Sequence, residues 1–198
     1  MKRNTLGIGI VLSAVLFVVT AFDADAQRKK KAPDKSQGAT VSQTIGMDTE
    51  ITIVYHRPGV RGRNVWVGSS EDSRIGPLVP QNGDPRPWRA GANEATVIEV
   101  STDVTIEGQA LAAGRYALFM IPTETDWTLI FNSNPKQWGS FRYKPEDDAL
   151  KVTVTPVEAP HEEWLKYGFD DAETNSATAY LHWEKKKVPF RIAVESGE

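Results

Sequence analysis

The sequence predicts an all-β fold: a single antiparallel β-sandwich or jelly roll of about ten short strands, with little helix. After residue 26 the chain holds 23 Val and Ile residues but only 7 Leu, and β-branched side chains favour strands. Apolar and polar residues alternate along many short windows, separated by turn signals about every 8 to 12 residues. No window has a convincing apolar stripe of helical period. A closed barrel is the alternative architecture.

The first strands are predicted from alternating windows and turn residues. Residues 41–45 and 51–55 alternate on either side of a turn at residues 46–48. Residues 94–105 contain one or two strands (ATVIEV, then DVTI), and Glu107-Gly108 supplies a turn before Leu111. Residues 115–121 and 126–131 flank a short loop that begins at Pro122, which is the spacing of a β-hairpin.

The remaining strands are predicted at residues 149–155, 164–169, 177–184 and 188–194. In the last pair, apolar residues alternate from Ala179 to Trp183 and again from Phe190 to Val194, so we expect the three lysines at 185–187 to form the turn between them. Single helical turns are predicted at residues 135–138 and 160–164, where a proline is suited to the first helical position.

The N-terminal residues 1–26 are predicted to be a signal peptide. Lys2 and Arg3 precede an uncharged, mostly apolar run over residues 6–22, and Ala24-Asp25-Ala26 has the small-x-small pattern of a cleavage site. An uncleaved anchor is the alternative. Residues 27–39 are predicted to be a disordered basic tether, and residues 40–195 a β-sandwich domain. We therefore expect an exported, periplasmic or extracellular protein without a membrane span after cleavage.

Composition narrows the classes of partner and chemistry. The net charge of −3 is too slight for a nucleic-acid-binding surface. The absence of cysteine excludes disulfides, thiol nucleophiles and thiolate metal sites. The three histidines, His56, His161 and His182, have no metal-ligand spacing, and we place His161 at a turn and His182 on an outward strand position. We expect no metal, no cofactor and no catalytic residue.

An arginine-rich loop carries the main functional hypothesis. Residues 57–89 contain six arginines and no lysine, among many Gly and Pro residues. A guanidinium offers a planar fork of donors that lysine cannot replace. The predicted ligand-binding residues, for a carboxylate-bearing or carbohydrate ligand, are Arg57, Arg63, Trp88, Arg89, Asn93 and Glu94. The alternative is that these arginines only pin loops to the domain through carbonyls and carboxylates.

Two further interpretations remain open. Glu94 with Asp147 or Asp148 is a candidate pair for hydrolysis of an envelope polysaccharide, if the carboxylates face one gap. A purely structural or protein-partner domain is the other. Trp127 and Trp183 lie in strand patterns and are predicted to be core residues, whereas Trp66, Trp88 and Trp138 lie in loops. Trp138 is expected to plug the open end of the sandwich.

Several short segments together resemble one family. They are YHRP (55–58), GR (62–63), LVP (78–80), WRAGANEAT (88–96), AGRY (113–116) and WG (138–139). The sequence resembles the secreted bacterial family catalogued as domain of unknown function 2911 over about residues 40–194. The resemblance implies export and a single β-rich domain, and it implies no reaction. From the arginine-rich loop, our first interpretation is a non-catalytic binding module of the cell envelope, a monomeric β-sandwich with an arginine-rich rim.

Overall fold

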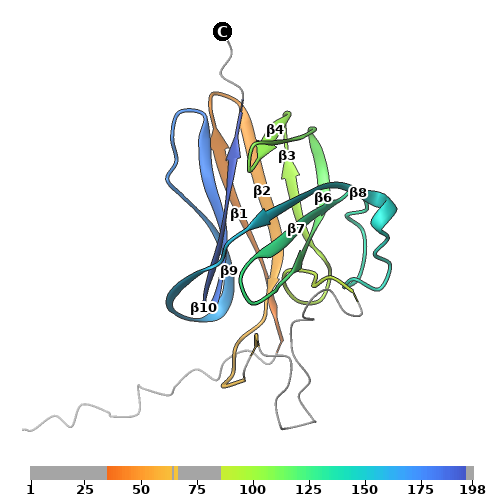
Figure 1. Cartoon of the computed structure of the whole chain (residues 1–198), viewed down its shortest axis with the longest axis vertical. Helices are drawn as coiled ribbons and strands as arrows, with labels where there is room; N and C mark the ends of the chain where they lie inside the picture. Colours follow the sequence, from red (N-terminus) through yellow and green to blue (C-terminus); the bar gives the residue numbers. More distant parts are fainter. Residues whose placement is uncertain (1–34, 64, 67–85, 195–198) are drawn as a thin grey trace, which may run out of the picture. The chain divides into compact units, whose positions relative to one another are not determined.

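The computed structural model describes residues 35–63, 65–66 and 86–194 (Figure 1). The predicted signal peptide, most of the predicted tether and residues 67–85 of the arginine-rich loop, which include Arg74, lie outside the described residues. No helix within the described ranges combines the length and apolar character that a membrane span requires.

The described chain forms an all-β sandwich of two antiparallel sheets, as the sequence predicts (Figure 1). The six-stranded sheet has the order β1-β2-β3-β6-β7-β8 and the four-stranded sheet the order β5-β4-β10-β9. The strands are β1 (Gln37–Ile45), β2 (Thr49–Arg57), β3 (Thr96–Val100), β4 (Val104–Ile106), β5 (Gln109–Leu111), β6 (Gly114–Ile121), β7 (Trp127–Asn132), β8 (Asp148–Val154), β9 (Val157–Asp170) and β10 (Ser176–Ala193). β1 thus begins three residues before the predicted start of the domain.

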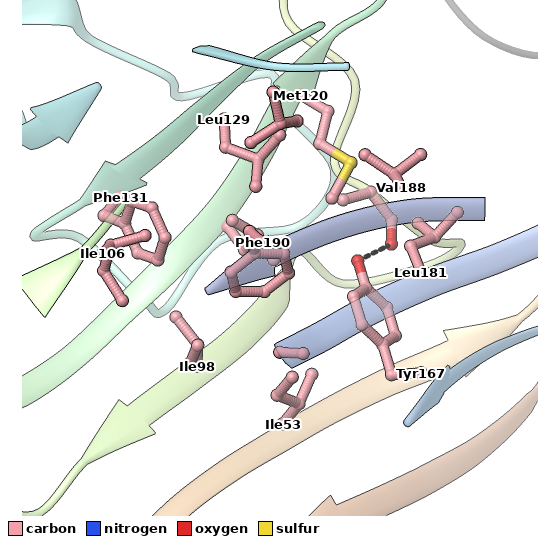
Figure 2. Close-up of a cluster of buried hydrophobic side chains, with 14 of the residues drawn as sticks. Ile53, Ile98, Ile106, Met120, Leu129, Phe131, Tyr167, Leu181, Val188 and Phe190 are labelled. Atoms are coloured by element: carbon pink, nitrogen blue, oxygen red, sulfur yellow. Dashed lines mark hydrogen bonds between the residues drawn. The ribbon is translucent and has the colours of Figure 1, made fainter. Parts of the chain in front are cut away.

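The core lies between the two sheets and follows from the alternation of apolar residues. In β2, Ile51, Ile53 and Tyr55 are buried while the residues between them are more exposed, as a strand with one face on the core requires. One continuous apolar cluster combines side chains of both sheets (Figure 2). Phe131 of β7 and Phe190 of β10 meet across it, with ring centroids 6.4 Å apart.

A cluster of four tryptophans extends this core. Trp127 and Trp183 are buried, as predicted. Trp66 and Trp88, which the sequence places in loops, pack against both of them with ring centroids 5.1 to 6.4 Å apart. Edge-to-face and stacked rings at such distances stabilise each other beyond the burial of their area. The arginine-rich loop is therefore anchored in the core at two of its described points.

The predicted turn at the three lysines is wrong. β10 is one strand of 18 residues that continues through them. It pairs with the 14-residue strand β9, and the register shifts around Glu184, which has a positive φ of 56°. An extra residue in a bulge bends a strand without ending it. Because β9 supplies pairing partners as far as Lys187, the chain continues in β structure through the lysines instead of reversing.

Both predicted helical turns are also wrong. Residues 160–164, with His161 among them, lie within β9, and residues 135–138 have no helical structure. The single short helical turn described is a 3-10 turn at Pro145–Asp147, with proline at its start. Proline fits a first helical position, but it also fits an edge strand, and β9 is an edge of the four-stranded sheet.

Candidate functional site

The segment WRAGANEAT forms a closed loop at one end of the six-stranded sheet. Trp88 pairs with Met120 of β6 through two backbone hydrogen bonds of 2.8 Å. The amide of Thr96, the first residue of β3, donates to the carbonyl of Arg89 at 3.2 Å. We call residues 89–94 the rim loop. Its two ends are therefore held together just before the start of β3, and of its six residues only Glu94 is exposed, while Arg89 and Asn93 are partly buried.

The rim loop has an unusual backbone that buried hydrogen bonds hold in place. Ala90 and Asn93 have positive φ values of 51° and 61°, which cost about 1 kcal/mol or more for residues with a Cβ. The buried carbonyl of Ala90 accepts from the Thr96 hydroxyl at 2.9 Å and from the Tyr167 hydroxyl at 2.8 Å. Burial raises the pKa of Tyr167 well above its ordinary value. At neutral pH this hydroxyl therefore remains a donor.

Close packing also explains why residue 91 of the WRAGANEAT segment is a glycine. A Cβ on Gly91 would lie 2.8 Å from the hydroxyl oxygen of Thr96 and 3.1 Å from the carbonyl oxygen of His56. The first distance is shorter than real Cβ atoms show, so a larger residue would push the rim loop away from β2 and β3.

The segment at residues 137–139 pairs with the rim loop. Ala95 donates its amide to Gln137, and Gly139 donates its amide to Asn93, each at 3.0 Å. The segment presents Trp138 with 58% of its surface exposed. The prediction that Trp138 plugs the sandwich is wrong, because the Trp138 side chain is exposed and the neighbouring Gln137 is buried instead.

An open groove of about 440 Å³ lies beside Trp138. Val54 of β2 and Val97 of β3, which are paired across the two strands, lie on its apolar side. Its polar residues include His56 and Glu94, whose Nδ1 and Oε2 atoms are 3.3 Å apart. The other lining residues are Ala95, Pro135, Lys136, Gln137 and Trp138. An apolar groove with a few polar groups is typical of a ligand site.

Arg89 lies against the backbone of the same segment. A Cβ on Gly139 would lie 3.0 Å from a terminal guanidinium nitrogen of Arg89, so the glycine leaves room for this side chain. The Nε of Arg89 is buried and has no hydrogen-bond partner in the part of the chain that the structure describes. Burial lowers the pKa of Arg89 from its ordinary value, but an arginine remains charged at neutral pH. The Nε of Arg89 is thus a donor that no described residue uses.

Two neighbours of Arg89, together with Arg89 and Trp138, form one surface. Phe141 is 67% exposed, and the Arg86 guanidinium lies over its ring at 5.3 Å from the centroid. We call Arg86, Arg89, Trp138 and Phe141 the Trp138 surface. It combines two exposed aromatic rings with two guanidinium groups, and within the described ranges the Nε of Arg89 has no acceptor.

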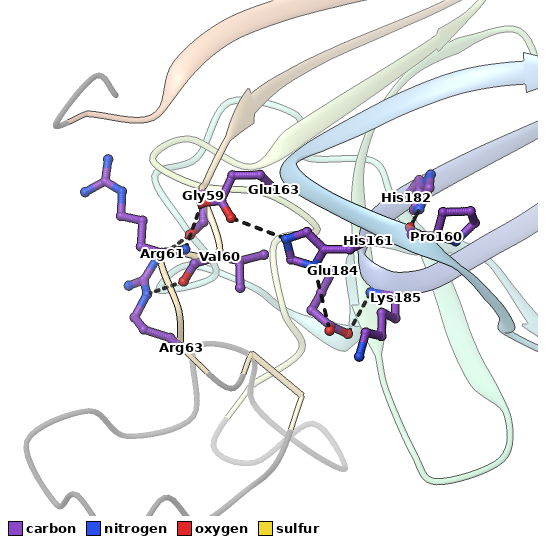
Figure 3. A network of polar contacts seen from close by, with 10 residues as sticks. All are labelled: Gly59, Val60, Arg61, Arg63, Pro160, His161, Glu163, His182, Glu184 and Lys185. Carbon is purple, nitrogen blue, oxygen red and sulfur yellow. Dashed lines mark hydrogen bonds and ion pairs between the residues drawn. The ribbon is translucent and has the colours of Figure 1, made fainter. Parts of the chain in front are cut away.

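Arg57 and Arg63 instead bind backbone carbonyls. Arg57 donates from Nε to the carbonyl of Leu165 at 2.9 Å and from a terminal nitrogen to that of Trp164 at 3.4 Å. Arg63 donates to the carbonyls of Val60 and Gly59 at 3.0 and 2.6 Å (Figure 3). These bonds are the loop-pinning contacts of the alternative interpretation, and they use donors that the ligand hypothesis assigned to a ligand.

The other candidate residues lie in different surroundings. Trp88 is buried, with its indole N–H bonded to the Gly91 carbonyl at 3.2 Å. Asn93 donates from its side chain to the carbonyl of Ser36 at 3.4 Å, just before β1. Asp147 and Asp148 do not line the groove that contains Glu94. Among the six predicted ligand residues, only Arg89, Asn93 and Glu94 therefore lie on or beside the Trp138 surface and its groove.

The remaining histidines take part in strand-edge contacts. His161 of β9 lies 3.4 Å from Glu163 and 4.0 Å from Glu184 (Figure 3). His182 lies on β10, as predicted, and its Nε2 is 2.8 Å from the carbonyl oxygen of Pro160. Within residues 35–63, 65–66 and 86–194, no three His, Asp or Glu side chains are placed to hold a metal ion.

Sequence reasoning missed the groove and the exposure of Trp138 beside it. Residue types gave a usable signal, because an amphipathic ring in a loop is suited to ligand stacking as well as to burial. For His56 the sequence predicts only that it has no metal-ligand spacing, although the strand alternation places it on the solvent face beside Val54.

Comparison with known proteins supports the family and leaves the activity open. No curated protein and no solved structure matches the chain. The family described as protein of unknown function (DUF2911) matches residues 36–192, which include both sheets and the whole rim loop. The chain therefore belongs to this family, as its WRAGANEAT segment indicates.

Proposed function

We propose that this protein is a non-catalytic, exported binding module whose Trp138 surface and adjoining groove recognise a carboxylate-bearing carbohydrate. The observation that carries the proposal is the partly buried Arg89 guanidinium, whose Nε has no hydrogen-bond partner among the described residues. A cation held away from bulk water without a partner is unfavourable. A ligand carboxylate would supply the acceptors that the fork lacks.

The aromatic residues favour a ligand with a flat apolar face. Trp138 and Phe141 are exposed, and the paired side chains of Val54 and Val97 give the groove an apolar side. Pyranose rings offer such faces, and the Trp138 ring can cover one while its indole N–H stays in water. His56 and Glu94 add polar groups that suit sugar hydroxyls.

The same geometry favours binding over hydrolysis. A glycosidase needs two carboxyl groups on either side of one bond, at most about 10 Å apart. Glu94 lines the groove, but neither of its two candidate partners does. Asp148 already accepts from Asn132 and Tyr143 and pairs with Lys151. Glu94 instead pairs with His56.

The test is calorimetric titration of the protein with digalacturonate and with its methyl ester, which has the same shape without the charge. We expect the acid to bind more tightly than the ester. Arg89→Lys should raise the Kd for the acid about tenfold or more, because lysine keeps the charge but loses the fork. Trp138→Ala should weaken the binding of both the acid and the ester.

Arg142→Lys is the matched control, because Arg142 is an exposed arginine one residue beyond Phe141. It should leave both Kd values unchanged. Equal affinity for acid and ester, or unchanged affinity in Arg89→Lys, would contradict the proposal. Absence of binding by the unmodified protein to either probe would also contradict it.

A further inference from the structure

The β1 edge of the six-stranded sheet is not covered by any strand in the described part of the chain. β1 pairs with β2 over nine residues in unbroken register, and no described strand pairs with its other side. The strand contains no charged residue, no proline and no bulge. A long, regular, uncharged edge strand is a template for pairing with another strand.

The strands at the other three sheet edges have features that discourage pairing with another strand and that β1 lacks. β5 has only three residues. β8 carries Asp148 and Lys151. β9 contains Pro160 and several charged residues, and its register shifts against β10. Residues 58–60 also cover part of β9, because the Leu165 amide donates to Pro58 and the Val60 amide to Glu163. Short length, charge, proline and coverage each discourage edge pairing.

We propose that β1 is a dimerisation edge that pairs antiparallel with β1 of a second copy of this chain, joining the two six-stranded sheets. A two-fold axis perpendicular to the sheet brings residues of the same face together. On the solvent face these residues are Gly38, Thr40, Ser42 and Thr44. Small hydroxyl side chains suit one another across a strand pair, and without charges the strand does not repel its own copy.

The chemistry of β1 selects a second copy over a charged peptide. An extended peptide bearing charges would find no countercharge on β1. One strand pair makes a small interface, so the dimer is expected to form in a concentration-dependent way.

The first test is sedimentation velocity of the full-length chain in a density-matched detergent, from about 1 μM to about 1 mM. The mass should rise toward twice that of the chain. Thr40→Lys places like charges near the axis and should keep the chain monomeric. Thr40 is exposed and no described residue bonds its side chain, so the melting temperature should not change. Thr153→Lys, on exposed Thr153 of the β8 edge, is the control and should dimerise like the unmodified chain.

The second test uses the absence of cysteine from the chain. Single cysteines placed in turn at positions 39 to 43 should crosslink two copies under mild oxidation at the position nearest the axis, and weakly at its neighbours. Thr153→Cys should not crosslink. A chain that remains monomeric to about 1 mM would overturn the proposal. So would a dimer that Thr40→Lys retains and that no β1 cysteine crosslinks, because the interface would then lie elsewhere.

Discussion

The rim loop should be stabilised by two donors that share one acceptor, and a double-mutant cycle can measure this. Thr96 and Tyr167 both donate to the carbonyl of Ala90. All three residues are buried, with relative exposures of 0%, 4% and 0%. Water therefore cannot replace a lost donor without a rearrangement of the loop. Figure 2 shows the Tyr167 hydroxyl bonded in this way among apolar side chains.

The expected magnitudes follow from what each variant leaves behind. Thr96→Val and Tyr167→Phe each remove one donor and leave the carbonyl with the other, so each should lower the free energy of unfolding by about 1 kcal/mol. The double variant leaves a buried carbonyl with no side-chain donor, which adds about 1 to 3 kcal/mol. The total loss should therefore be about 4 kcal/mol, and the coupling energy about 2 kcal/mol.

The assay is urea denaturation of the four proteins, followed by tryptophan fluorescence. Thr96→Val combined with Tyr116→Phe is the control pair, because Tyr116 donates to the carbonyl of Ala112 at 2.9 Å and shares no acceptor with Thr96. That pair should be additive. If the Thr96 and Tyr167 variants were additive within about 0.5 kcal/mol, the shared acceptor would not matter and the reasoning would be refuted.

Two further predictions concern Arg57 and Tyr167. Arg57→Ala should lower the free energy of unfolding by about 2 kcal/mol in urea titrations, because it removes charged donors from the carbonyls of Trp164 and Leu165; an unchanged stability would show that these bonds do not hold the loop. The raised pKa of Tyr167 predicts a loss of stability at alkaline pH. Below pH 10 its hydroxyl is protonated in both states, and above pH 10 only the unfolded state releases the proton. The free energy of unfolding should fall by about 1.4 kcal/mol per pH unit from this group. Tyr167→Phe should have a smaller slope between pH 10 and 11, and an equal slope would exclude this contribution.

The sequence determined the class of fold and the direction of most side chains. Alternation in a strand depends only on the two-residue repeat of the backbone, so the buried face of β2 and the buried positions of Trp127 and Trp183 could be predicted locally. The hairpin of β6 and β7 could also be predicted locally, from the short loop between its two strands. The family was also determined at this level, because the WRAGANEAT segment is a local string of residues.

Only the tertiary structure decided where strands end and which donors remain free. The lysines at 185–187 continue as strand because β9 supplies pairing partners for them, and those partners lie far from the lysines in the sequence. Arg57 and Arg89 are the same residue type in similar loop sequence. Arg57 lies beside two carbonyls of β9, whereas Arg89 lies beside Gly139, where no described residue accepts from its Nε. A hydrogen bond needs a partner within about 3 Å, and that partner comes from a segment whose position the local sequence does not encode.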